Sequence, residues 1–214
     1  MNTTDQLHQL LQERILIIDG AMGTMIQLHK FEEADFRGER FATHSHDLKN
    51  NYDVLCLTQP DIIETIHRQY LDAGADIIET NTFNANAISM GHYKLSHIAR
   101  ELNVAAARLA RRAVDDAMQK NPTRPRFVAG AIGPMNKTLT LGRDVEDPGK
   151  RDVTYDEVMA GYYEQVQALM ESGVDLLLCE TTFDTLNLKA AQFAIEKYFD
   201  DSGQRVPVMA SVTF

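Results

Sequence analysis

The chain has 214 residues, of which 44% are hydrophobic and 24% are charged, as in one soluble globular domain. Its formal net charge of −10 disfavours nucleic acid and anionic membrane surfaces as partners. The apolar runs are too short to cross a bilayer, and the N-terminus lacks the basic-then-apolar pattern of a signal peptide. Two cysteines, Cys56 and Cys179, do not make a disulfide framework, so we expect a cytoplasmic location.

Helices and strands are expected to alternate along the first half of the chain. A short helix begins near Thr4, and a continuous apolar run over residues 15–18 predicts a buried first strand. The polar segment 30–51 has no clean period, which predicts a long connecting loop. A helix with Pro60 in its first turn then leads into a second strand over residues 76–79.

The second half continues this alternation, with a capping-box pattern formed by Thr154 and Glu157. We expect, in order, a helix over residues 96–120, a strand over 127–132, a polar loop over 136–152, a helix after Thr154, a strand over 176–179, a helix over 186–199 and a fifth strand over 207–214.

This order predicts an α/β fold with a parallel sheet. Two architectures are consistent with it: a complete open sheet of five strands, or a (β/α)8 TIM barrel. In the barrel, residues 1–214 would be the N-terminal part, with about five β/α units present and strands 6–8 absent. The long loops and strand-end carboxylates favour the barrel. We expect such a chain, alone, to be aggregation-prone or molten unless it dimerises, because its first and last strands would lack partners.

One sequence motif occurs twice: the end of a helix, a glycine, a short apolar strand and then a carboxylate. It places Glu79 and Glu180 at equivalent strand ends, and Asp19 ends the first strand in the same way. The carboxyl ends of parallel strands meet at one edge of the sheet, where ligands bind. We therefore expect these carboxylates to surround the amine of a small polar substrate, with Asn81 and Thr82 as neutral donors.

Other candidate residues have simpler interpretations. His44 and His46 lie two apart in a polar segment without a third metal ligand in register, which predicts a solvated loop. Cys56 and Cys179 are flanked by apolar residues, which predicts buried thiols rather than ligands. Lys137, in the motif that begins at Gly133 after the third strand, is the one lysine expected near the rim.

Four motifs together resemble the homocysteine S-methyltransferase family: Asp19-Gly-Ala-Met-Gly-Thr, Glu79-Thr-Asn-Thr-Phe, Gly133-Pro-Met-Asn-Lys-Thr and Glu180-Thr-Thr-Phe. Their order and wording are most similar to the N-terminal homocysteine-binding module of cobalamin-dependent methionine synthases. The resemblance implies a (β/α)8 barrel that binds homocysteine at its upper rim. The implied activity is methyl transfer to the homocysteine thiolate, giving methionine, with zinc and methylcobalamin as cofactors and separate folate and cobalamin modules as partners.

The resemblance also implies roles for individual residues. Asp19 and Glu180 would lie near the substrate ammonium, and the backbone of Gly20, Ala21 and Met22 would surround its carboxylate. We expect three further residues to complete the substrate site: Glu79, Asn81 and Thr181.

The sequence departs from the family at the metal. Family members bind zinc through three cysteine thiolates, two of them adjacent, and neither Cys56 nor Cys179 lies in such a motif. We expect the zinc cysteines beyond Phe214, and hence a chain that has no catalytic residue of its own, binds neither zinc nor methylcobalamin and is inactive in isolation. Two alternatives stay open: a non-catalytic amino-acid-binding fragment, or a barrel enzyme that uses Glu79 or Glu180 as acid or base on a carbonyl substrate.

Overall fold

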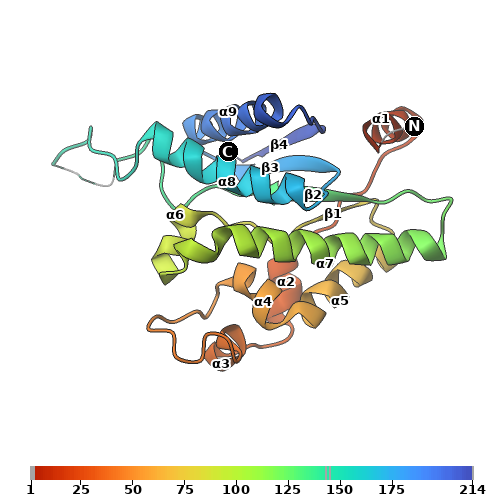
Figure 1. Cartoon of the computed structure of the whole chain (residues 1–214), viewed down its shortest axis with the longest axis horizontal. Coiled ribbons are helices and arrows are strands. Elements are labelled where there is room, and N and C mark those ends of the chain that lie inside the picture. The colour runs from red at the N-terminus through yellow and green to blue at the C-terminus, as the bar shows by residue number, and fades with distance from the viewer. Residues whose placement is uncertain (1–2, 143, 145, 214) are drawn as a thin grey trace.

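The computed structural model describes residues 3–142, 144 and 146–213. A parallel sheet lies among the helices, and its neighbouring strands follow one another in chain order (Figure 1). The strands are β1 (Ile77–Glu79), β2 (Phe127–Ile132), β3 (Leu176–Thr182) and β4 (Val208–Val212). All three strand pairs are parallel, which confirms the predicted α/β fold with a parallel sheet.

Four long helices follow the strands or lead into them. They are α5 (Pro60–Ala73), α7 (Ala99–Lys120), α8 (Tyr155–Glu171) and α9 (Thr185–Ser202). Their ends match the sequence signals: Pro60 begins α5, a left-handed Gly74 ends it, and Thr154 and Glu157 form the predicted capping box of α8. The helices α7, α8 and α9 cover one face of the sheet with a continuous apolar core.

The two faces of the sheet bury different residues because side chains alternate along each strand. Val128, Leu177 and Cys179 belong to the helix-covered core. Ile77, Phe127 and Leu178 belong to a smaller cluster on the other face, together with Leu7 from α1 (Thr3–Glu13). Since Glu79 follows Ile77 by two residues and Glu180 follows Leu178 by two, both carboxylates extend from this second face.

The segment 30–51 is not a simple loop, contrary to the sequence-based prediction. It contains α3 (Glu33–Arg37), whose capping box is formed by Glu32 and Asp35. Its apolar residues Phe36, Phe41 and Leu48 are buried in a separate core. That core also contains α2 (Met22–Gln27), α4 (Leu55–Thr58), α6 (Ala87–Met90), and the 3-10 turns η1 (Tyr52–Val54), η2 (Gly91–Tyr93) and η3 (Ser96–Ile98).

The predicted first strand is also wrong in its burial. Residues 15–18 form only an isolated parallel bridge between Ile18 and Ile77. Ile15 is 83% exposed and Ile17 is 54% exposed. The reason is position, because this segment lies at an edge of the described sheet and pairs on one side only. At the other edge, β4 likewise exposes Val208, Met209 and Val212.

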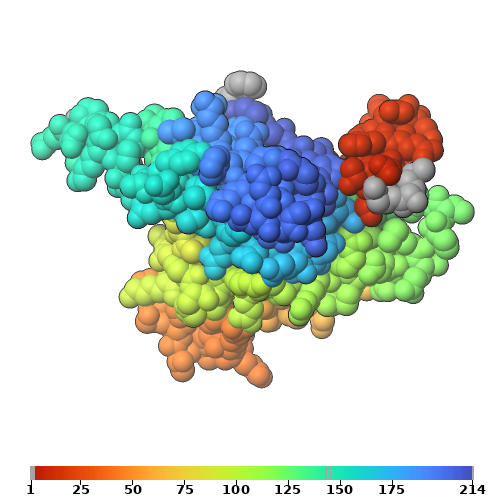
Figure 2. All heavy atoms as spheres, turned by 45° about the horizontal axis from the view of Figure 1, so that its top comes forward, coloured from red at the N-terminus to blue at the C-terminus, as the bar shows by residue number. Residues whose placement is uncertain are grey.

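The polar connection between β2 and α8 projects from the body of the molecule (Figure 2). Its described residues contain no helix or strand, as the sequence predicts. The base of this connection is fixed by Asp184, whose carboxylate accepts hydrogen bonds from the backbone N–H groups of Leu139 and Thr140. Among the described helices, none is long and apolar enough to cross a membrane.

A buried carboxylate anchors the start of β1. Asp76 accepts hydrogen bonds from Arg14, at 2.7 and 2.9 Å, and from the Ile17 N–H at 3.0 Å. Arg124 and Arg126 also contact it. Burial alone would raise the pKa of Asp76, but the hydrogen bonds from Arg14 and Ile17 outweigh it and lower the pKa to about 2.

Replacing Asp76 by Asn should therefore destabilise the fold by about 3 kcal/mol or more, because Arg126 would remain buried without its counter-charge. Urea unfolding at pH 7 measures this loss. The carboxylate contributes its stability above the ordinary pKa and loses it as the pH falls toward 2. Asp47→Asn, at a side chain that is 93% exposed, is the matched control. Equal unfolding midpoints for the two variants would contradict the anchoring role.

Candidate carboxylate-lined site

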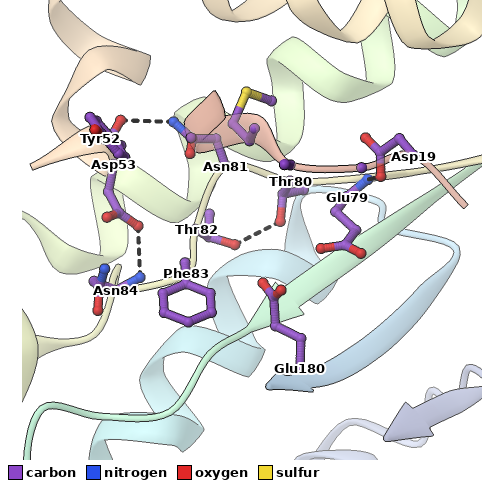
Figure 3. Close-up of a pocket in the computed structure, with 14 residues that line it drawn as sticks. Asp19, Tyr52, Asp53, Glu79, Thr80, Asn81, Thr82, Phe83, Asn84 and Glu180 are labelled. Carbon is purple, nitrogen blue, oxygen red and sulfur yellow. Dashed lines mark hydrogen bonds between the residues drawn. The ribbon is translucent and has the colours of Figure 1, made fainter. Parts of the chain in front are cut away.

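A cavity of about 340 Å³ opens at the carboxyl ends of the strands. Four segments of the chain contribute to it (Figure 3). Its lining residues are Asp19, Gly20, Ala21, Met22, Gly23, Tyr52, Asp53, Glu79, Thr80, Asn81, Thr82, Phe83, Asn84 and Glu180. The structure thus brings together all the residues proposed from the sequence except Thr181. That residue is exposed, has a left-handed backbone with φ of 52° and does not line the cavity.

The three strand-end carboxylates converge as the repeated motif predicts. Asp19 is held by its backbone N–H, which donates to Ile77 O at 2.8 Å, and its Oδ1 accepts from the Glu79 N–H at 3.0 Å. The Glu79 side chain extends between Asp19 and Glu180 (Figure 3). The carboxyl groups of Glu79 and Glu180 extend toward each other in the same cavity (Figure 3).

This crowding changes the protonation of the group. Burial, followed by the charge of Glu79, raises the pKa of Glu180 to about 8. The same two causes, opposed by the Glu79 N–H, raise the pKa of Asp19 to about 8. Burial also raises the pKa of Glu79, and its contact with Glu180 opposes that rise. Near neutral pH the cluster therefore retains protons that exposed carboxyls would have lost.

No positive side chain balances this cluster within the described cavity. The lining residues include four carboxyl groups, and none of them is lysine, arginine or histidine. Tyr52, Phe83 and Met22 add apolar surface beside the carboxylates. A small ligand that carries both an ammonium group and an apolar chain would complement this lining.

The floor of the cavity contains residues that sequence analysis missed. Asp53 is buried, and its carboxylate accepts from the Asn84 N–H at 2.8 Å. Burial raises the pKa of Asp53 to about 6. Asn81 donates from Nδ2 to Tyr52 O at 2.8 Å. The Tyr52–Asp53 pair lies just after the segment assigned to a loop, and its only sequence signal was a polar pair before an apolar run.

The Gly133 motif supports this cavity from outside. A Cβ on Gly133 would lie 2.3 Å from Phe83 O, so only glycine permits the close packing of Phe83, which lines the cavity. Lys137, in the same motif, does not reach the carboxylates. Its Nζ binds Asp152 at 3.0 Å, and it lines a separate hollow with Asn136 and His92.

The described residues do not provide a thiolate metal site. Cys56 and Cys179 are both buried, and burial raises the pKa of each thiol. Cys179 belongs to the helix-covered core, on the face of the sheet away from Glu180. His44 binds Tyr93 O at 2.8 Å through Nε2. Within the part of the chain that the structure describes, no group of three His, Cys, Asp or Glu residues is placed to bind a metal ion.

Glu180→Gln should stabilise the chain at pH 8. The folded state holds a proton on Glu180 up to about pH 8, whereas the unfolded chain releases it near the ordinary value of 4.5. Stability therefore falls as the pH rises between these values, and the variant avoids that fall. We expect a gain of about 1 to 2 kcal/mol at pH 8, because solvent reaches part of the pair. At pH 5 the free energies of unfolding of the variant and the unaltered chain, measured in urea, should be almost equal. A variant less stable than the unaltered chain at pH 8 would contradict repulsion between the buried carboxylates.

Comparison with known proteins agrees with this geometry. The sequence model of the homocysteine S-methyltransferase family matches residues 16–214. The metallated form of the Escherichia coli homocysteine methyltransferase MmuM is 24% identical, with a TM-score of 0.70 over 92% of this chain and 63% of that one. Its oxidized form is 25% identical, with a TM-score of 0.69 over the same shares of the two chains. Its apo form is 23% identical, with a TM-score of 0.65 over 96% of this chain and 62% of that one.

The chain therefore spans less than two thirds of the length of these solved structures. Their similarity shows a shared fold, and the family model matches the sequence over nearly its whole length. The chain belongs to the homocysteine S-methyltransferase family.

Proposed function

We propose that the chain supplies the amino-acid-binding part of a site where the sulfur of homocysteine accepts a methyl group, giving methionine. The observation that carries this proposal is the convergence of Asp19, Glu79 and Glu180 in one cavity that has no cationic lining residue in the described chain. Family membership supplies the reaction class. The architecture that fits both is the first part of a (β/α)8 barrel.

The binding mode follows from the positions of the lining residues. The homocysteine ammonium would bind between Asp19 and Glu180, where charge-assisted hydrogen bonds form with carboxylate oxygens. Gly20, Ala21 and Met22 would bind the substrate carboxylate through their backbone N–H groups. Asn81 and Glu79 would complete this pocket around the headgroup, and the apolar side chains would contact the methylene chain. Because Thr181 does not line the cavity, we assign it no contact with substrate.

The chemistry at sulfur requires groups beyond those described here. In this family a zinc ion, when bound, keeps the substrate sulfur as thiolate. The two buried thiols of this chain do not fit such a site. We therefore propose that the zinc ligands lie outside the sequence of this chain, and that it acts as the homocysteine-binding module of a cobalamin-dependent methionine synthase. The amino-acid sequences of the four motifs support that assignment.

The carbonyl-enzyme alternative is less well supported. Glu79 and Glu180 have the raised pKa that a general acid near neutrality needs. However, such a reaction also needs a lysine or metal beside them, and Lys137 instead binds Asp152 outside the cavity. Amino-acid binding without chemistry is the function that the described residues support directly.

Substrate binding is tested by calorimetric titration with L-homocysteine. Glu180→Ala and Asp19→Ala should each weaken binding at least about tenfold, because each removes a charge-assisted contact with the ammonium. Glu196→Gln, at an exposed residue of α9, is the matched control. A homocysteine analogue without the amino group should bind weakly and equally to all four proteins. Unchanged homocysteine affinity in both alanine variants would refute the assigned ammonium site.

Zinc content provides a separate test of the proposal that this chain binds the amino acid but does not contain the zinc ligands. After incubation with zinc and dialysis, this chain should retain far less than the one zinc per site that three thiolates would bind. Elemental analysis measures the ratio, with Cys56→Ser and Cys179→Ser as controls that should leave it unchanged. A stoichiometric zinc that is lost in either serine variant would show that the chain carries its own metal site.

A further inference from the structure

We infer that the cavity exchanges a proton for the substrate's ammonium, with the Glu79–Glu180 pair holding that proton while the cavity is empty. The inference rests on the proposed function, because it assumes that an α-amino acid is the ligand. It adds a role for Glu79 as the partner that keeps Glu180 protonated, and it makes binding depend on pH.

The geometry of the cluster supports a shared proton. Glu79 ends β1, Glu180 lies near the end of β3, and both side chains extend into the same cavity (Figure 3). Two carboxylates that share one buried cavity cannot both be ionised without strong repulsion. Asp19 adds a third carboxyl group beside Glu79, since it accepts the Glu79 N–H at 3.0 Å.

The groups on the surrounding elements do not relieve this repulsion. From η1, Asp53 adds another carboxyl group and Tyr52 a neutral phenol. From α5, the Tyr70 hydroxyl donates to Ala21 O at 3.4 Å, and from α4, Cys56 contacts Asn81. None of these groups is a cation, so within the described residues a bound proton is what removes one of the two negative charges of the pair. The raised pKa of Glu180 is consistent with the absence of a cation among these neighbouring groups.

The exchange balances in atoms and charge. In the empty cavity one O–H bond of the pair holds the proton, and the carboxyl that carries it donates to the other carboxylate. An arriving ammonium donates N–H bonds to Asp19 and Glu180 and supplies a positive charge beside Glu79, so the O–H bond ionises and the proton passes to solvent. The ammonium therefore replaces the charge of the released proton, and the ligand's own carboxylate adds one negative charge beside the backbone of Gly20, Ala21 and Met22. A ligand without an ammonium group would not displace the proton.

Titration calorimetry at pH 7 tests this directly with L-methionine, which has the same headgroup and no titratable thiol. The heat is measured in phosphate and in Tris, whose ionisation enthalpies differ, and the difference gives the number of protons released. We expect about one proton per ligand for the unaltered chain. Affinity should also tighten between pH 6 and pH 8 by up to about tenfold per pH unit.

The Glu79→Gln variant should release fewer protons per bound ligand than the unaltered chain, because without the charge of Glu79 a larger fraction of Glu180 ionises before the ligand arrives. Glu180→Gln should show the same loss, which gives a second variant should the first fold poorly, and Glu196→Gln should match the unaltered chain. Circular dichroism and urea unfolding verify that each variant is folded.

Each other result has one meaning. Binding of L-methionine with heats that do not depend on the buffer would overturn proton exchange while leaving the proposed function intact. Undiminished proton release in both folded glutamine variants would overturn the assignment to this pair. Failure of the folded, unaltered chain to bind either L-methionine or L-homocysteine would overturn the proposed function and this inference together.

Discussion

Mutual repulsion among Asp19, Glu79 and Glu180 is the interaction that the remainder of the fold must overcome. The parallel register fixes these groups at one edge of the sheet, where burial raises the pKa of each and the charge of Glu79 raises the pKa of Asp19 and Glu180 further. A sheet free to relax would separate them. Their convergence therefore implies that packing elsewhere supplies the free energy that holds the cavity open, as is common where binding groups are destabilising in the empty protein.

Part of that free energy comes from the opposite ends of the same strands. The repeated motif has an aspartate at each strand start as well as a glutamate near each exit. Asp76 accepts the Ile17 N–H at 3.0 Å, and Asp175 accepts the Val128 N–H at 2.7 Å. Each aspartate thus joins its own strand to the segment before it, and each also pairs with arginine. The aspartates at the strand starts are paired with arginine, whereas the carboxyl groups at the carboxyl ends face a cavity whose described lining contains no cation. One end of the motif therefore stabilises the fold, and the other end is available to bind a ligand.

How far sequence could predict this structure depended on whether the signal was local. Pro60, Gly74 and the Thr154–Glu157 box act within one helical turn, so the ends they predict are observed. The parallel order followed from the repeated motif. Burial of Phe36 and Leu48 depends on distant helices, and their spacing has no helical period, so the sequence of this segment predicts a loop. The exposure of residues 15–18 and the role of Asp53 likewise depend on neighbours remote in sequence.

The polar residues that follow Glu79 fix the turn after β1 through hydrogen bonds to the backbone. Thr82 Oγ1 donates to Ala131 O at 2.7 Å, and Thr80 Oγ1 accepts from the Ala131 N–H at 3.0 Å. These bonds attach the turn to β2 and satisfy buried backbone groups that would otherwise be unpaired. Asn81 is similarly engaged with Tyr52 O. Since these side chains are used to fix the turn, the carboxylate of Glu79 is the ionisable group that the turn presents to the cavity, and the surrounding residues set where it points.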